Sequence, residues 1–318
     1  MNYDTPKASH VTPAMADIPW RQRNFRDNDQ VEAVTVHRGL VTRRGLLRAA
    51  GFAAPAILLS HSAPAQFTGC LPAFCSRPSF TPAISGIVGM WDASNFPSLT
   101  LSGADILSVA DGSGGGNTMT PAGSGHKPQY NATGFNSRPA MVFTATDLGA
   151  FEAASFPIGT GNTLTVWYVG TLANNASQPF GRFMSYTKPA AAADFNNVGS
   201  FGMTTNSGSQ TLVQVANNSV FVTNSGLAAP PAGHRIIVTK DSSGVITIYV
   251  DGVAGTPATS VGNWVSAGFA NIGMQHASIA SGVDFISAAV GECGIATSFN
   301  NSAAVAAIDV GLKNKWGL

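Results

Sequence analysis

From residue 84 onward, short runs of β-branched and aromatic residues alternate with turns rich in Gly, Asn, Ser and Pro. No helical pattern lies between these runs, so their spacing predicts an antiparallel β-sandwich and not alternating strand–helix units. The runs occupy residues 84–91, 140–144, 164–172, 211–216, 220–223, 235–240, 245–250, 270–274 and 284–295.

The clearest local pattern is a hairpin at residues 234–250. Two apolar runs flank the short turn Asp241-Ser242-Ser243-Gly244. In the second run the residues alternate, so that Ile246, Ile248 and Val250 share one face of the expected strand. Residues 251–252, an Asp-Gly pair, predict a further turn directly after it.

One amphipathic helix is expected at the C-terminal end of the sequence. Val305, Ile308, Leu312 and Trp316 recur at three- and four-residue spacing, and residues 300–302 offer side chains that can cap the first turn. The apolar stripe predicts that this helix docks onto the sandwich, with Trp316 filling the contact.

Composition agrees with a single large globular domain. The chain has 318 residues, of which 44% are hydrophobic and 10% charged, with 35 glycines and 18 prolines. All-β sandwiches reach about 200–250 residues as one domain. Residues 66–318 carry nine Lys/Arg and eleven Asp/Glu, which argues against nucleic acid or an anionic membrane as the main partner.

Residues 1–65 resemble a twin-arginine export signal. The pair Arg43 and Arg44 precedes a weakly apolar run at 49–59, and the Ala63-Pro64-Ala65 site would be cut before Gln66. This run is shorter than the roughly 20 residues of a membrane-spanning helix, so no transmembrane span is expected. We expect a leader at 1–65, a linker at 66–83, a sandwich at 84–318, and a periplasmic or secreted location. The alternative is that 1–65 is an uncleaved arm that packs on a partner.

Three cysteines are too few for a scaffold built on disulfides. Cys70 and Cys75 are close enough in sequence to bridge a short loop in an oxidising compartment. Cys293 lies in an apolar run, where we expect a buried free thiol.

Several stretches carry a family resemblance. Residues 89–94 (GMWDAS), 109–117 (VADGSGGGN), 137–143 (SRPAMVF) and 164–169 (LTVWYV) resemble the opening of bacterial and phage laminin-G-like domains. The hairpin and the ending LKNKWGL at 312–318 match in the same order, so the resemblance covers about 235 residues, 84–318. It implies an all-β, antiparallel jelly-roll β-sandwich of the concanavalin A-like kind with a C-terminal helix. That fold carries lectins, glucanases, adhesion modules and virion parts alike.

Catalytic chemistry has little support in the sequence. Glycoside hydrolysis needs two positioned carboxyl groups, and the glucanases of this fold place theirs as Glu-x-Asp-x-Glu, a motif that this chain lacks. After residue 65 the only glutamates are Glu152 and Glu292. His126, His234 and His276 are scattered and belong to no triad or zinc motif. We therefore expect no enzyme.

Metal and ligand sites have candidates among loop residues. Oxygen ligands suit Ca²⁺, and Asp92, Asp111 and Asp147 could supply them, but solvated turn residues are the better explanation of these positions. Asn-rich loops can match sugar hydroxyls and an aromatic face can stack on a sugar ring, whereas Asn also simply fills turns. The ligand-binding candidates are Asn174, Asn175, Gln178, Tyr186, Asn196, Asn197, Asn206, Asn217 and Asn218.

These observations together predict a non-catalytic, extracytoplasmic module that recognises a glycan or another cell-surface polymer through its loops. The alternative is a structural phage protein, a head or tail decoration or a fibre, that contacts other virion proteins through its N-terminal arm. A glucanase-like hydrolase is the third reading, and it would need Glu152 or Glu292 to pair with an aspartate.

Overall fold

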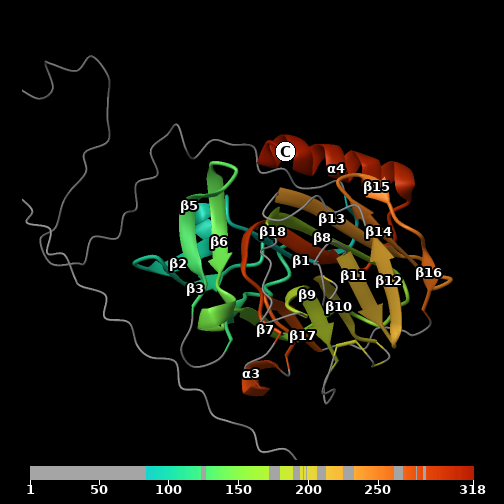
Figure 1. Cartoon of the computed structure of the whole chain (residues 1–318), viewed down its shortest axis with the longest axis horizontal. Coiled ribbons are helices and arrows are strands. Elements are labelled where there is room, and N and C mark those ends of the chain that lie inside the picture. Colours follow the sequence, from blue (N-terminus) through green and yellow to red (C-terminus); the bar gives the residue numbers. More distant parts are fainter. Residues whose placement is uncertain are drawn as a thin grey trace, which may run out of the picture. The chain divides into compact units, whose positions relative to one another are not determined.

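The computed structural model describes residues 84–122, 127–171, 180–188, 194–195, 197, 199–205, 213–224, 233–260, 268–276, 278–281 and 284–318. Two antiparallel sheets and a long C-terminal helix make up this part of the chain (Figure 1). The predicted all-β antiparallel sandwich with a C-terminal helix is confirmed. The leader with Arg43, Arg44, Ala63 and Ala65, and the candidate disulfide pair Cys70 and Cys75, lie outside the described residues.

The larger sheet has eleven strands, with β18 near its centre. β18 pairs with β8, β6 and β1, and β16 pairs with β14 beside the edge strand β15. Its strands are β1 (Ile87–Asp92), β2 (Leu99–Ser102), β3 (Asp105–Val109), β5 (Gln129–Phe135), β6 (Arg138–Phe143), β8 (Leu164–Thr171), β13 (Gly233–Lys240), β14 (Val245–Val250), β15 (Val253–Ala254), β16 (Ala258–Thr259) and β18 (Ala288–Ala296).

The smaller sheet has seven strands in the order β12-β11-β10-β9-β17-β7-β4. Its strands are β4 (Thr120–Pro121), β7 (Phe151–Phe156), β9 (Arg182–Thr187), β10 (Phe201–Thr205), β11 (Val213–Asn217), β12 (Val220–Asn224) and β17 (Gly268–Ile272). Short 3₁₀ turns occupy η1 (Phe96–Ser98) and η2 (Ala145–Asp147), and the helices are α3 (Ser278–Ser281) and α4 (Ser302–Trp316).

The main core lies between the two sheets. Trp91 of the larger sheet contacts Phe156 of the smaller one at a ring separation of 5.8 Å, and Tyr168 contacts Phe183 at 5.5 Å. The predicted alternation in β14 is confirmed, because its burial alternates strictly and the even-numbered residues face this core. Burial of aromatic and aliphatic side chains from both sheets holds the layers together.

The predicted hairpin is β13 and β14. Asp241 accepts hydrogen bonds through Oδ1 from the backbone N–H groups of Ser243 and Val245, at 2.8 and 2.9 Å, and so fixes the turn. The run predicted at 284–295 begins too early. Asp284 has a left-handed φ of +64°, outside the range of a regular extended strand, and β18 starts at Ala288.

Helix α4 covers the outer face of the larger sheet beside β13 (Figure 1). Asn301 caps its first turn by accepting from the N–H of Ala304 at 3.0 Å, and Gly317 ends it in the left-handed conformation. The predicted apolar stripe is buried, and Trp316 packs against Phe135 at 5.8 Å. The predicted docking of this helix is therefore confirmed.

Candidate functional site

The outer face of the smaller sheet, which points away from the shared core, carries a group of polar residues. Ala270 and Ile272 of β17 face the core, so Phe269 and Asn271 between them face outward. Residues directly opposite each other in an antiparallel pair share a face. Asn271 is opposite Glu152 of β7, and the Glu152 side chain therefore lies on the same outer face.

The segment after β17 turns back over this face. Gly273 has a φ of +90°, a conformation that favours glycine, and starts the reversal. Ser185 of β9 holds the returning chain by donating from Oγ to the carbonyl of Met274 at 2.9 Å. The imidazole of His276 then stacks on the ring of Phe269, with 3.6 Å between ring centroids and 7° between ring planes.

Glu152, Asn271, His276 and Phe269 form what we call the Glu152–His276 site. Oε2 of Glu152 accepts from Nδ2 of Asn271 at 2.8 Å and from Nδ1 of His276 at 2.6 Å. A carboxylate only accepts, so Nδ1 of His276 carries a proton and, in the neutral imidazole, Nε2 is an acceptor. Glu152 and His276 are 16% and 31% exposed, and both can be reached by a ligand.

Several polar atoms around this site lack partners. Within the described residues, neither Oε1 of Glu152 nor Nε2 of His276 has a hydrogen-bond partner. Oδ1 of Asn271 and Oγ1 of Thr187, which is opposite Phe269, are buried and also unpaired in this part of the chain. A buried unpaired polar atom costs about 1–3 kcal/mol of folding free energy.

A β-bulge lies beside the stacked pair. Ala153 pairs with Ala270 and Phe156 pairs with Gly268, so Ala154 and Ser155 together lie opposite the single residue between them. Both bulge residues are exposed, and Ser155 has a φ of +58°. Bulges bend a strand and are frequent next to functional sites. Here the bulge leaves small side chains next to Phe269.

A buried ion pair fixes another loop over the same face. Arg182 of β9 binds Asp194 in a bidentate manner at 2.7 and 2.9 Å. Asp194 lies above Gly202, where an added Cβ would be 2.3 Å from the Asp194 Oδ2 atom. Burial alone would lower the pKa of Arg182, but the Asp194 carboxylate raises it overall. The positive charge of Arg182 is thus neutralised within the fold.

Glu292 lies in a different network, buried under α4. It accepts from Nε1 of Trp167 at 3.0 Å, from Nζ of Lys315 at 2.5 Å and from Nε1 of Trp316 at 3.3 Å. Nζ of Lys315 also donates to Asp92 at 2.5 Å. Burial raises the pKa of Glu292, although Lys315 opposes this rise. The network anchors α4, and Glu292 is inaccessible to a substrate.

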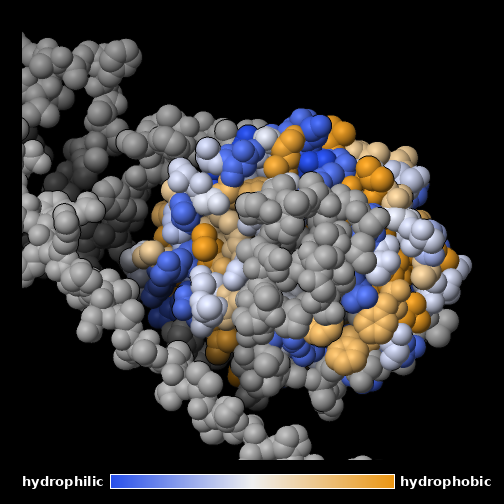
Figure 2. All heavy atoms as spheres, viewed as in Figure 1, coloured by the Kyte–Doolittle hydropathy of each residue, from blue (hydrophilic) through white to orange (hydrophobic). Residues whose placement is uncertain are grey.

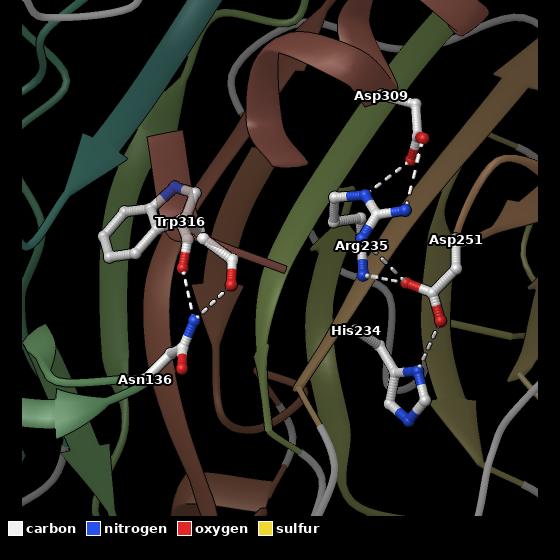
Figure 3. A network of polar contacts seen from close by, with 7 residues as sticks. Asn136, His234, Arg235, Asp251, Asp309 and Trp316 are labelled. Carbon is white, nitrogen blue, oxygen red and sulfur yellow. Dashed lines mark hydrogen bonds and ion pairs between the residues drawn. The ribbon is translucent and has the colours of Figure 1, made fainter. Parts of the chain in front are cut away.

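A second network anchors the same helix (Figure 3). Arg235 donates from Nε to Asp309 of α4 at 2.8 Å, and His234 contacts Asp251 through Nδ1 at 2.8 Å. Burial would raise the pKa of Asp251, but the hydrogen bonds from His234 and from the backbone of Arg235 lower it. Asn136 holds the helix end by donating to the carbonyls of Trp316 and Gly317.

The candidate calcium ligands are not brought together as one site. Asp111 organises the glycine-rich turn by accepting from the backbone of Met90, Ser113 and Asn117. Asp92 is bound to Lys315, and Asp147 is an exposed residue of η2. Among the described residues no group of three or more His, Cys, Asp or Glu side chains could hold a metal ion.

The structure places four of the predicted ligand-binding residues, and they do not form one exposed loop. Tyr186 alternates onto the inner face of β9, where burial raises its pKa to about 12 and its hydroxyl accepts from the N–H of Gly268. Asn217 is buried, with Oδ1 accepting from Nζ of Lys240 at 3.1 Å. Neither residue belongs to an exposed rim. Asn218 lies in the tight β11–β12 turn with a φ of +50°, and Asn197 lies in the loop before β10. The other candidates lie outside the described residues, namely Asn174, Asn175, Gln178, Asn196 and Asn206.

Sequence reasoning did not find the Glu152–His276 site. Glu152 and His276 are far apart in the chain, and each looks unremarkable in its own segment. The weak signal available was the glycine at 273, which ends a strand and is followed closely by a histidine. Cys293 is buried as expected, and burial raises its pKa well above the ordinary value.

Figure 2 shows hydrophilic and hydrophobic residues interspersed on the visible surface, including the solvent face of α4. Large exposed apolar side chains include Phe221, Phe299 and Val310. No helix in the described part of the chain is long and apolar enough to cross a membrane.

No protein-family model matches the chain, and a search of curated proteins finds no significant match. The resemblance to laminin-G-like domains therefore stays a prediction. Several solved structures are similar at low identity. One is domain 4 of AbnA, a GH43 extracellular arabinanase from Geobacillus stearothermophilus, in complex with arabinotriose, with 11% identity, 70% of this chain and 98% of that chain covered, and a TM-score of 0.47.

Two further structures are similar over only part of their own length. The binding domain of botulinum neurotoxin DC in complex with SialylT has 13% identity, with 72% of this chain and 52% of that chain covered and a TM-score of 0.49. The Trypanosoma rangeli sialidase has 10% identity, with 74% of this chain and 34% of that chain covered and a TM-score of 0.47.

Proposed function

We propose that this protein is a non-catalytic binding module that acts outside the cytoplasm and recognises a glycan or another cell-surface polymer. The observation that carries the proposal is the Glu152–His276 site. It offers a partly exposed carboxylate oxygen and a ring nitrogen, both without partners in the described part of the chain. The site is held on the strands of the smaller sheet.

The chemistry of this site suits a sugar. Sugar hydroxyls donate hydrogen bonds, which Oε1 of Glu152 and Nε2 of His276 can accept. The stacked imidazole adds a flat ring face against which a sugar ring can pack, while Phe269 behind it fixes the ring orientation. Because Glu152 and Asn271 come from paired strands, a ligand meets a preorganised site and little ordering is lost on binding.

Two features support a binding role over hydrolysis. Hydrolysis of a glycoside uses two carboxyl groups about 5–5.5 Å or roughly 6.5–9.5 Å apart. Glu292 is held under α4 by Lys315, and Glu152 already shares one oxygen between Asn271 and His276.

The paired arginines at 43 and 44 and the Ala-x-Ala site at 63–65 support export.

A glycan array and a cell-wall pull-down with the full chain test the proposal. We expect binding to at least one polysaccharide, no release of reducing sugar, and at least a tenfold loss of affinity in His276→Ala. Phe299→Ala, which removes an exposed aromatic side chain that precedes α4, serves as the control and should bind as the unaltered protein does. Failure to bind any polysaccharide or surface polymer would contradict the proposal.

The mature N-terminus of the native protein tests the export part separately. Intact-mass measurement should give a chain that begins at Gln66. A chain that keeps Met1 inside a virus particle would favour the structural phage protein instead.

A further inference from the structure

We propose that the Glu152–His276 site selects uncharged glycans and rejects acidic ones. This inference rests on the proposed binding function and names the class of ligand that the same site would take.

The first argument is the balance of donors and acceptors. Oε1 of Glu152 is an acceptor, and Nε2 of His276 is an acceptor in the neutral imidazole; neither atom has a partner within the described residues. The Nδ2 group of Asn271 and the Nδ1 group of His276 are not available to a ligand in the same way, because both already donate to Oε2 of Glu152. A ligand group that meets Oε1 of Glu152 must therefore donate. Hydroxyl groups donate, whereas carboxylate and sulfate groups only accept.

The second argument is charge. The carboxylate of Glu152 is 16% exposed, so an acidic ligand at this site would come close to its negative charge. The cation held over the same face, Arg182, is bound on two atoms by Asp194 and offers no free charge to an acidic ligand. Residues 66–318 also carry more acidic than basic side chains. Like charges brought together at a binding site weaken binding strongly.

The hydrogen-bond pattern makes one substitution unusually informative. Both internal donors share the single oxygen Oε2, so Glu152→Gln can keep both bonds with its carbonyl oxygen in that place. The amide nitrogen then replaces Oε1 at the exposed position. The substitution thus removes the negative charge and turns the ligand-facing atom from an acceptor into a donor, while the site itself is preserved.

The experiment measures affinities of the full chain for oligosaccharides in matched pairs, each neutral sugar with its uronic acid or sialylated counterpart. For the unaltered protein we expect at least tenfold tighter binding of the neutral member. In Glu152→Gln that ratio should fall to within about threefold. Asp147→Asn, which removes an exposed charge in η2, is the control and should leave the ratio unchanged.

The salt dependence of the unaltered protein gives a second measurement that needs no variant. Raising the ionic strength from about 0.02 to 0.5 M should narrow the neutral-to-acidic ratio, because salt screens the repulsion. Two results would overturn this inference and leave the proposed function standing. One is equal affinity for the acidic and neutral members of a pair, and the other is a neutral-to-acidic affinity ratio that does not change with ionic strength. A protein that binds neither member refutes the proposed function itself.

Discussion

Replacement of Lys315 by methionine should destabilise the protein strongly, because it breaks a buried ion network and keeps the side-chain length. Nζ of Lys315 is 2.5 Å from a carboxylate oxygen of Asp92 and of Glu292, and the three side chains are 9%, 8% and 0% exposed. Without the ammonium group, two buried carboxylates of like charge face each other. Removing one partner of a buried ion pair typically costs about 3–5 kcal/mol, and we expect a loss of that size at pH 7.

The pH dependence follows from Glu292. Burial already raises its pKa, and Asp92 raises it further against the lowering effect of Lys315. In Lys315→Met the ammonium group that lowers the pKa of Glu292 is absent, so the pKa of Glu292 in the folded state rises further. A carboxyl group with a raised folded-state pKa destabilises the fold above that pKa and has no effect below the unfolded-state pKa of about 4.3. The deficit of the variant should therefore shrink as the pH falls from 7 toward 4.3.

Urea unfolding followed by tryptophan fluorescence at pH 7 and pH 5 measures this deficit. Trp167 and Trp316 both contact Glu292 and report on the site directly. Lys313→Met on the exposed side of the same helix is the control and should change the free energy of unfolding by less than about 0.5 kcal/mol. A cost below about 1 kcal/mol for Lys315→Met, or one that grows as the pH falls, would refute this reasoning.

Three other measurements probe the fold. Burial lowers the pKa of Lys240 to about 8, so its charged form destabilises the fold. As the pH rises from 7 to 10.5 the unaltered protein loses this penalty, and the stability of Lys240→Met should fall by about 3 kcal/mol relative to it. A difference in the free energy of unfolding by urea that stays constant over this pH range would contradict the prediction. Gly294→Ala would place a Cβ 2.1 Å from Trp167 and should cost at least about 1–3 kcal/mol, whereas Gly161→Ala, which has open space around it, should be nearly neutral in the same assay. The thiol of Cys293 should react with a disulfide reagent only after unfolding, in a variant whose other two cysteines are serines, and fast labelling of the folded protein would count against its burial.

The parts of the fold that were predicted depend on local periodicity. The alternation in 245–250 and the turn at Asp241 define the β13–β14 hairpin from neighbouring residues alone. The helical spacing from Val305 to Trp316 likewise identifies α4 and its buried face. The start of β18 was missed, because nothing in the residue pattern from 284 to 295 marks Ala288 as the first residue of the strand.

The candidate site could not be predicted in the same way. It depends on which strands pair, because β17 brings Asn271 beside Glu152 and the reversal at Gly273 then carries His276 back to both. Strand order and reversal geometry leave no periodic trace in the sequence. Tyr186 was predicted to be a loop residue whose ring could stack on a sugar, whereas the two-residue period of β9 turns its ring inward.

The central position of β18 also constrains how this protein is made. Trp91, Met141 and Tyr168 lie in strands that pair with β18, and all three are synthesised well before it. At roughly 5–20 residues per second, these strands are without their β18 partner for several seconds, although β6 can already pair with β5 and β8 with β13. We therefore expect the larger sheet to close only when β18 has emerged, so that a growing chain depends on chaperones, and a product truncated before residue 288 does not assemble this sandwich.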